Sequence, residues 1–261
     1  MTDLEHSLSD NPQLGFGVDI GGSGVKGAVV DLATGDLVTE RFKILTPKPS
    51  TPDAVAEVVA QLMEMAGWNG PVGITVPAVV KNQHARSAAN IDKAWIDTDL
   101  QELFARHLGE REIAVLNDAD AAGLAEVELG DELARKGTVL MLTFGTGIGS
   151  AMLHDGQLFP NSELGHLPFN DKGDAEWHAS SAAKDREELS YKKWAKRVDE
   201  VLHLYSRLFS PQTFIVGGGI SRKADKWVPL LTVEQDVIPA KLRNQAGIIG
   251  AAMAVRDGIK P

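Results

Sequence analysis

A strand, a glycine-rich turn and a second strand occur twice in this chain, and this repeat constrains the fold more than any other feature. The first copy reads "LGFGVDI", "GGSG" and "VKGAVVD". The second reads "TVLMLTF", a turn that contains several glycines, and "SAMLHDG". The copies are separated by roughly 125 residues, which is too long for the period of a solenoid. The repeat therefore predicts duplicated domain halves, each with its own hairpin.

Strands and helices alternate along the rest of the chain, which is typical of an α/β fold. In the helix predicted over 51–67, Thr51 stands at the N-cap and Pro52 in the first turn. The stripe of Tyr191, Trp194, Val198, Val201, Tyr205 and Leu208 predicts the buried side of a longer helix. Helices are predicted at 51–67, 99–108, from 118, at 186–209, from about 221 and at 245–255, and strands at 14–20, 25–31, 37–44, 71–80, 112–117, 138–144, 150–156 and 213–217.

Composition excludes several classes of protein. The 261 residues include no cysteine, so disulfide frameworks, thiolate metal sites and cysteine nucleophiles are excluded. No run of about 18 apolar residues occurs, and the acidic start does not resemble a secretory signal. The net charge of −10 disfavours general binding to nucleic acid or to anionic membranes. We therefore expect a cytoplasmic protein with no nucleic-acid or membrane partner, whose residues 1–13 form a disordered tail.

The first glycine turn has the composition of a phosphate-binding loop. Glycines allow the backbone amides to approach an anion closely, a hydroxyl adds a donor, and a lysine adds positive charge. A plain hairpin explains one such loop equally well. The candidate phosphate-binding residues of this turn are Asp19, Gly21, Gly22, Ser23, Gly24 and Lys26.

A second glycine-rich loop strengthens this interpretation. The stretch "TFGTGIGS" places hydroxyls among its glycines, and a run of three glycines follows a later strand. Neither matches a Rossmann fingerprint or a Walker loop, so paired hairpins that hold a phosphate chain fit better. The candidates here are Thr143, Gly145, Thr146, Gly147 and Gly149, together with Gly217, Gly218 and Gly219.

Polar residues follow a buried strand at Asn117 and Asp118, where α/β proteins often place active-site groups. One interpretation is that these residues only cap the following helix. The other is that the Asp118 carboxylate accepts the proton of an attacking hydroxyl, the role of aspartate in phosphoryl transfer. A lone His166 is most simply a hydrogen-bonded histidine, but next to Glu163 in "ELGH" a ligand-binding role is favoured.

These motifs, in order, resemble the ROK sugar kinases of the actin-like superfamily. The resemblance covers residues 14–255 and rests on Asp19-Ile20-Gly21-Gly22, "LNDADAAGLAE", "TFGTGIGS", "ELGH" and "IVGGG". Within that family, "AANIDKAW", "LNDADAAGLAE", "LTFGTGIGSA" and "ISRKADKWVPLL" resemble the actinobacterial polyphosphate glucokinases, some of which also use ATP. The resemblance implies transfer of a terminal phosphoryl group from polyphosphate, and from ATP, to the 6-hydroxyl of glucose.

The resemblance also implies roles for individual residues. Asp118 would be the general base, and Mg²⁺ would bind donor phosphates with Asp19 nearby through water. Amides and carboxylates supply the paired donors and acceptors that vicinal sugar hydroxyls need. The implied sugar-binding residues are Asn90, Asn117, Glu163, His166 and Glu176.

The same resemblance implies the architecture. We expect an α/β fold of two actin-like (RNase H-like) domains with mixed sheets and an interdomain cleft. The expected domains are a small N-terminal domain over 14–116, completed by a C-terminal helix at 245–257, and a larger domain over 117–244. A homodimer is also implied.

The sequence departs from the family at two places. Many ROK kinases carry a cysteine cluster for zinc after "ELGH", but this chain has no cysteine, so no structural zinc is expected. The polyphosphate kinases have glycine where this chain has Gln83 and Asp97, and a carboxylate at 97 could disturb the path of a polyanion. Local sites for such a polyanion include the lysines of the helix at 186–209, which are otherwise its solvated face.

Two other functions remain open at this point. One is an ATP-dependent kinase of another hexose, mannose or fructose, because the sequence discriminates poorly between epimers. The other is a sugar-sensing ROK regulator without catalysis. Such regulators carry an N-terminal helix-turn-helix domain, and the first phosphate loop begins too early in this chain to leave room for one.

Overall fold

The computed structural model describes residues 8–88, 91–169, 171 and 173–261, which form two compact units. Unit 1 contains the residues up to Ala125 and those from Gln245 onward, and unit 2 contains Glu126 to Asn244. The expected boundary was between 116 and 117. Residues 117–125 lie with unit 1, because the first turns of the helix that begins at Asp118 pack against its C-terminal helix.

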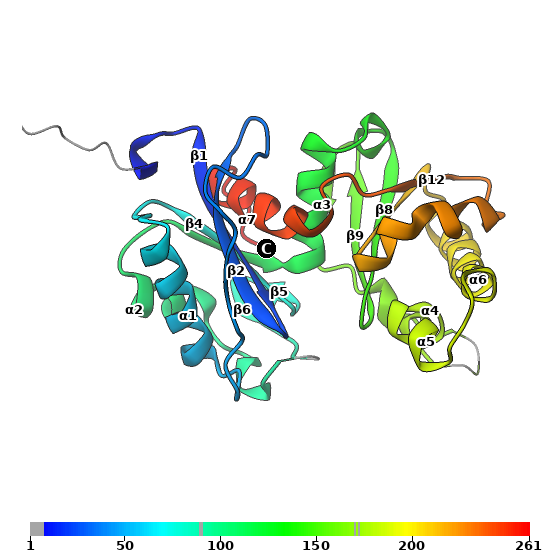
Figure 1. The fold of residues 1–261 in the computed structure, drawn as a ribbon, viewed down its shortest axis with the longest axis horizontal. Helices are drawn as coiled ribbons and strands as arrows, with labels where there is room; N and C mark the ends of the chain where they lie inside the picture. Colours follow the sequence, from blue (N-terminus) through cyan, green and yellow to red (C-terminus); the bar gives the residue numbers. More distant parts are fainter. Residues whose placement is uncertain (1–7, 89–90, 170, 172) are drawn as a thin grey trace, which may run out of the picture. The chain divides into compact units, whose positions relative to one another are not determined.

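A five-stranded mixed sheet forms the centre of unit 1 (Figure 1). Its spatial order is β3 (Phe42–Ile44), β2 (Gly24–Asp31), β1 (Leu14–Gly21), β4 (Val72–Val76) and β7 (Ile113–Asn117). The first three strands are antiparallel neighbours, whereas β1, β4 and β7 run parallel. The carboxyl ends of these parallel strands therefore meet at one edge of the sheet.

Helices cover both faces of this sheet. They are α1 (Pro52–Met65), α2 (Leu100–Leu108), α3 (Asp118–Leu129) and α7 (Ala246–Arg256). Val115 of β7 packs in one apolar cluster with α1 and α2, whereas the adjacent Leu116 packs with Ala121 of α3 and Ala254 of α7. Neighbouring strand residues point to opposite faces, so these are the two covered faces.

Unit 2 repeats the strand arrangement of unit 1 (Figure 1). Its spatial order is β10 (Gln157–Phe159), β9 (Ile148–His154), β8 (Thr138–Phe144), β11 (Thr213–Gly217) and β12 (Asp236–Pro239). An antiparallel meander is again followed by two parallel strands. The duplicated hairpins predicted from the sequence are confirmed, although β10 and β12 were missed.

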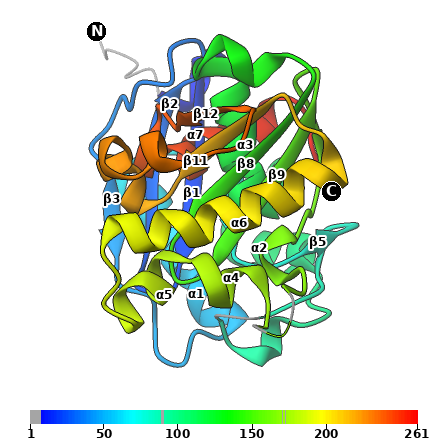
Figure 2. The ribbon, with the colours of Figure 1, turned by 90° about the vertical axis from the view of Figure 1, so that its right-hand side faces the viewer.

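The long helix α6 (Tyr191–Phe209) crosses the sheet of unit 2 (Figure 2). Its Trp194 is fully buried, with its ring 5.7 Å from that of Phe144 and 4.9 Å from that of Trp227. The helix begins later than the predicted residue 186, because Ser190 caps it by accepting a hydrogen bond from the N–H of Lys193. The prediction that Leu208 is buried was wrong, since 55% of it is exposed.

Short elements complete the fold. Residues 175–186 form two helices that the sequence analysis missed, α4 (Ala175–Ala179) and α5 (Ser181–Arg186). The helix predicted from 221 is instead a 3-10 helix with non-helical backbone at Lys223. Strands β5 (Val80–Lys81) and β6 (His84–Ala85) pair in a small hairpin. The 3-10 helices among the described residues include η1 (Leu8–Asp10), η2 (Lys93–Trp95), η3 (Glu132–Arg135), η4 (Leu164–His166), η6 (Gly219–Lys226), η7 (Val228–Leu230) and η8 (Arg243–Gln245).

The expected N-terminal tail is partly ordered. Residues 8–10 form a 3-10 helix, and the Ser9 hydroxyl accepts a hydrogen bond from the N–H of Asn69 at 2.8 Å. The prediction of disorder was therefore wrong for this part, because the segment packs against the rest of unit 1. Residues 1–7 lie outside the described residues.

Candidate active site

The first glycine turn joins β1 to β2 through Gly22 and Ser23, both exposed. Asp19 and Lys26 face each other across this hairpin, and Lys26 Nζ lies 2.8 Å from Asp19 Oδ2. The hydroxyl of Thr75 donates to Asp19 Oδ1 at 3.3 Å. Part of the Lys26 charge is therefore already neutralised, which the sequence analysis did not foresee.

Thr46 supports the same turn and was missed by the sequence analysis. Its side chain is buried, and its hydroxyl donates a hydrogen bond to the carbonyl of Gly21 at 2.5 Å. Thr46 lies in the segment after β3, distant in sequence from the hairpin. No local pattern marks such a contact, because it depends on how β3 pairs with β2.

Asn117 caps helix α3. Its Oδ1 accepts hydrogen bonds from the N–H groups of Ala119 and Asp120 at 2.8 and 3.2 Å, and its Nδ2 donates to the carbonyl of Ala78. Asn117 is buried, whereas the neighbouring Asp118 is exposed at the first residue of the helix. Helix capping thus accounts for the hydrogen bonds of the Asn117 side chain. The Asp118 carboxylate lies at the surface, where a substrate can reach it.

Sheet topology brings Asp19 and Asp118 of unit 1 to the same edge of its sheet. Asp19 is in register with Thr75 of β4, and Thr75 is in register with Leu116 of β7. Asp118 follows directly after the end of β7. The first phosphate loop and Asp118 therefore belong to the edge formed by the carboxyl ends of parallel strands, where α/β proteins bind ligands.

The second glycine turn joins β8 to β9, and Glu176 of α4 supports it. The N–H of Gly145 donates to the carbonyl of Gly147 at 2.9 Å, and the N–H of Ile148 donates to Glu176 Oε2 at 3.1 Å. A Cβ at residue 147 would lie only 2.1 Å from that carboxylate oxygen. A side chain at 147 would therefore force the Glu176 carboxylate to move away from the loop.

The remaining candidates of this loop surround the same edge of the unit 2 sheet. Thr146 is exposed at the turn, and Thr143 pairs with Gly149 across the hairpin. Strand β11 runs parallel to β8 with Gly217 in register with Thr143. The turn at Gly218 and Gly219 therefore follows β11 at the edge that carries the second hairpin.

A histidine and three carboxylates form a cluster in unit 2. His166 Nε2 lies 3.6 Å from Glu163 Oε2, and His166 Nδ1 lies 3.6 Å from Glu176 Oε1. The same Nδ1 lies 3.8 Å from Asp174 Oδ2. The structure thus brings together Glu163, His166 and Glu176, as the sequence analysis expected, and adds Asp174, which has no distinguishing motif.

Gly165 allows the "ELGH" segment to pack against β9. A Cβ at residue 165 would lie 2.1 Å from the carbonyl oxygen of Ile148. The Ser150 hydroxyl accepts a hydrogen bond from the N–H of Leu164 at 3.0 Å, and the buried Tyr205 donates to the carbonyl of Leu164 at 2.6 Å. Glu163 and His166 are therefore held by a fixed backbone.

Burial raises the pKa of the Glu163 carboxyl above its usual 4.5, with His166 opposing and Glu176 adding to the shift. A carboxyl with a raised pKa in the folded state favours stability below the usual value, and this contribution is lost as the pH rises through the folded value. We therefore expect Glu163→Gln to melt at a higher temperature than the wild type at pH 7, with the difference vanishing near pH 4.

Thermal melts at both pH values test this expectation, with Glu234→Gln as control because Glu234 is exposed in the same unit. The control should change the melting temperature little at either pH. A Glu163→Gln difference that does not depend on pH would contradict the expectation.

Asn90, which the resemblance assigned to sugar binding, lies outside the described residues. Within the described part of the chain, no group of three or more histidine, aspartate or glutamate side chains is arranged to hold a metal ion.

Gln83 and Asp97 both have left-handed backbone, with φ of 57° and 64°. Gln83 is buried, and its side chain pairs with both the N–H and the carbonyl of Val115. Asp97 is exposed, and its Oδ1 lies 2.6 Å from Arg86 Nη1. Left-handed backbone favours glycine, so the backbone at both positions would accept glycine without strain.

Comparison with known proteins shows the family to which this chain belongs. The profile of the ROK family matches residues 15–176. The chain belongs to the ROK family. It is 52% identical to a polyphosphate glucokinase of Mycobacterium tuberculosis over 92% of this chain and 90% of that protein.

Solved structures of ROK proteins share the fold. The inorganic polyphosphate/ATP-glucomannokinase from Arthrobacter sp. strain KM superposes with a TM-score of 0.88 at 47% identity, covering 94% of this chain and 99% of that one. A ROK family glucokinase from Streptomyces griseus, in complex with glucose and AMPPNP, superposes with a TM-score of 0.78 at 26% identity, covering 94% and 100%. The two actin-like α/β domains expected for a ROK protein are confirmed. Among the described residues, no helix is both long and apolar enough to cross a membrane.

Proposed function

We propose that this ROK protein transfers the terminal phosphoryl group of inorganic polyphosphate, and of ATP, to the 6-hydroxyl of glucose. The observation that carries the proposal is the 52% identity to a polyphosphate glucokinase along nearly the whole chain. The exposed Asp118 at a ligand-binding sheet edge and the two glycine hairpins are the groups that such a reaction needs.

Asp118 is proposed as the general base. Its carboxylate is exposed at the first residue of α3, and the N-terminus of a helix favours a negative charge there. The group would accept the proton of the sugar 6-hydroxyl as that oxygen attacks the terminal phosphorus. Asn117, immediately before it, fixes the start of the helix and so the position of the base.

Glu163, His166 and Glu176 are proposed to bind the sugar, together with Asn90 and Asn117. A histidine between carboxylates offers donors and acceptors at fixed separations, which suits vicinal hydroxyls. A sugar that lacks a matching hydroxyl would leave these groups unpaired, which costs affinity. Glu176 also supports the second hairpin, so it links sugar binding to the phosphate loop.

The glycine hairpins are proposed to bind the donor phosphates through backbone amides, with Ser23, Lys26, Thr143 and Thr146 adding side-chain contacts. Mg²⁺ is proposed as cofactor, and Asp19 fits an indirect role through water because Lys26 and Thr75 already contact its two oxygens. Magnesium retains several waters and uses few carboxylates, so a single carboxylate that acts through water is enough on the protein side. The ion would neutralise charge on the phosphate oxygens. No structural zinc is proposed.

Mannose is a second candidate substrate, because the Arthrobacter structure with a TM-score of 0.88 is a glucomannokinase. Initial rates with glucose, mannose and fructose, each against long-chain polyphosphate and ATP, test both proposals. We expect glucose to give the highest kcat/KM, with mannose next and fructose lowest. Activity only with fructose, or none with any donor, would contradict the proposed function.

A cytoplasmic homodimer is also proposed, and light scattering after gel filtration measures its mass.

Asp97→Gly tests the effect of the carboxylate at this position. The variant removes an exposed negative charge and releases Arg86, which we expect to raise the ratio of kcat/KM for polyphosphate over ATP by about 2–5-fold. Rates with both donors at fixed glucose measure the ratio. An unchanged ratio would show that Asp97 does not obstruct the polyphosphate chain.

A further inference from the structure

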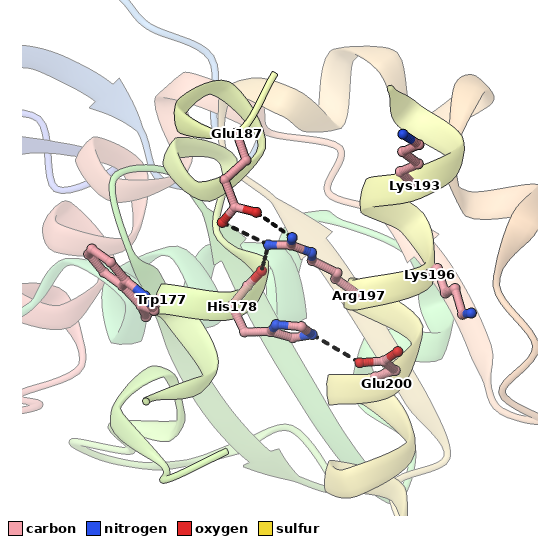
Figure 3. A pocket seen from close by; sticks show the side chains of 7 residues that line it. All are labelled: Trp177, His178, Glu187, Lys193, Lys196, Arg197 and Glu200. Atoms are coloured by element: carbon pink, nitrogen blue, oxygen red, sulfur yellow. Dashed lines mark hydrogen bonds and ion pairs between the residues drawn. The ribbon is translucent and has the colours of Figure 1, made fainter. Parts of the chain in front are cut away.

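A groove of about 440 Å³ lies on unit 2 between α6 and the segment of α4 and α5 (Figure 3). Trp177 and His178 of α4 and Glu187 at the end of α5 form one wall. The other wall is one side of α6 and carries Lys193, Lys196, Arg197 and Glu200. The sequence indicated the lysines but not the wall opposite them.

The acidic groups of this groove already have nitrogen partners from arginine or histidine side chains. Arg197 contacts both carboxylate oxygens of Glu187, and Arg186 lies 3.2 Å from one of them. The Arg197 hydrogen bonds hold the pKa of Glu187 down at about 2, so the pair stays charged. Glu200 Oε2 lies 3.0 Å from His178 Nε2.

Lys193 and Lys196 differ from these groups. Both are exposed, and neither has an acidic partner within 4.0 Å among the residues that the structure describes. Their charges are therefore available to an anionic ligand. Because the protein carries a net charge of −10, an anion needs such a local site.

The groove adjoins the second phosphate loop through the two short helices that form its wall. Glu176, next to Trp177, accepts the N–H of Ile148, and the N–H of Ala182 donates to the carbonyl of Gly145 at 3.0 Å. Helix α5 rises about 1.5 Å per residue, so Arg186 at its end lies only about 6 Å further along the axis than Ala182. A linear anion held at the loop therefore has a short path to the groove.

We propose that this groove binds the distal phosphates of a linear polyphosphate whose terminal phosphates are held by the glycine loops. The proposal rests on the proposed function. ATP ends in a nucleoside after three phosphates, so it would not use these lysines. One face of the exposed Trp177 is covered by the Arg186 guanidinium at 3.9 Å from the ring centroid, which disfavours stacking of a base there. Uniform negative charge without bases is the chemistry that the groove fits.

The test compares Lys193→Glu/Lys196→Glu with Lys136→Glu/Lys223→Glu. The control makes the same charge change in unit 2 at exposed lysines that do not line the groove. Initial rates are measured with long-chain polyphosphate, tripolyphosphate and ATP at several salt concentrations. Equilibrium binding of fluorescently labelled long-chain polyphosphate is measured in parallel, with RNA as competitor.

For the groove variant, we expect KM for long-chain polyphosphate to rise about 10-fold and the log–log dependence on salt to become shallower by about 1–2. Rates with ATP and tripolyphosphate, which also report correct folding, should stay within about twofold of the wild type. The control should resemble the wild type with all three donors.

Other outcomes separate the two proposals. One outcome is that the wild type binds long-chain polyphosphate, that the groove variant loses this binding, and that neither transfers a phosphoryl group from polyphosphate. This result would contradict the proposed function and support the groove. Polyphosphate turnover with an unchanged KM and salt dependence in the groove variant would overturn the groove alone. Equal effects on tripolyphosphate and long chains, no binding of long chains by the wild type, or efficient competition by RNA would also overturn it.

Discussion

Replacing Asp118 with asparagine is expected to lower kcat by about 10²–10⁴-fold while glucose still binds. The amide has nearly the shape of the carboxylate and keeps hydrogen-bonding atoms, but it cannot accept the proton of the 6-hydroxyl. Because Asp118 is exposed and Asn117 caps α3, the substitution leaves the core of unit 1 intact. Initial rates with saturating donor and glucose titration calorimetry measure the two quantities.

Asp225→Asn is the matched control for this variant, since it makes the same chemical change at an exposed aspartate in unit 2. Its kcat should remain close to that of the wild type. An Asp118→Asn enzyme with near wild-type kcat would contradict the general-base assignment. Loss of glucose binding together with kcat would instead indicate that the carboxylate positions the sugar.

Gly147→Ala is expected to damage both the second phosphate loop and sugar binding. The new Cβ would lie 2.1 Å from Glu176 Oε2, so Glu176 must move and its hydrogen bond from Ile148 must break. Because the collision is with the end of a flexible side chain, we expect the free energy of unfolding to fall by about 0.5–1.5 kcal/mol, the usual worth of one lost hydrogen bond. A displacement of about 1 Å at reacting groups can lower kcat/KM by about 10²-fold.

Denaturant unfolding and initial rates measure these effects, with two comparisons. A Cβ at Gly145 meets no atom within 4 Å, so Gly145→Ala should change the free energy of unfolding by no more than about 0.5 kcal/mol. In a background of Glu176→Ala, the collision is absent and Gly147→Ala should cost much less stability. Strictly additive effects of the two substitutions would contradict this account.

Much of the fold could be predicted because its signals are local. The hairpins at 14–31 and 138–154 contain turn residues between alternating apolar segments, and α1 has both a proline in its first turn and a glycine after its end. The helices α4 and α5 were missed because five or six residues are too few to show helical periodicity. The sequence predicted where the longer helices and strands lie along the chain, but not how they pack against one another.

The candidate site was predicted where a motif marks it and missed where a contact spans distant segments. "ELGH" indicated Glu163 and His166, but Asp174 joins them only because η4 and α4 fold together. The pairing of Lys26 with Asp19 follows from strand register, which a glycine count does not reveal. The partners of Gln83 on β7 were likewise invisible in the sequence.

Phosphorus NMR of the wild type with glucose, long-chain polyphosphate and Mg²⁺ tests the central claim most directly. We expect the resonance of glucose 6-phosphate to grow as the polyphosphate is consumed, and Asp118→Asn to abolish this growth on the same time scale. Release of inorganic phosphate without a sugar phosphate, or a phosphate ester on another hydroxyl of glucose, would contradict the claim.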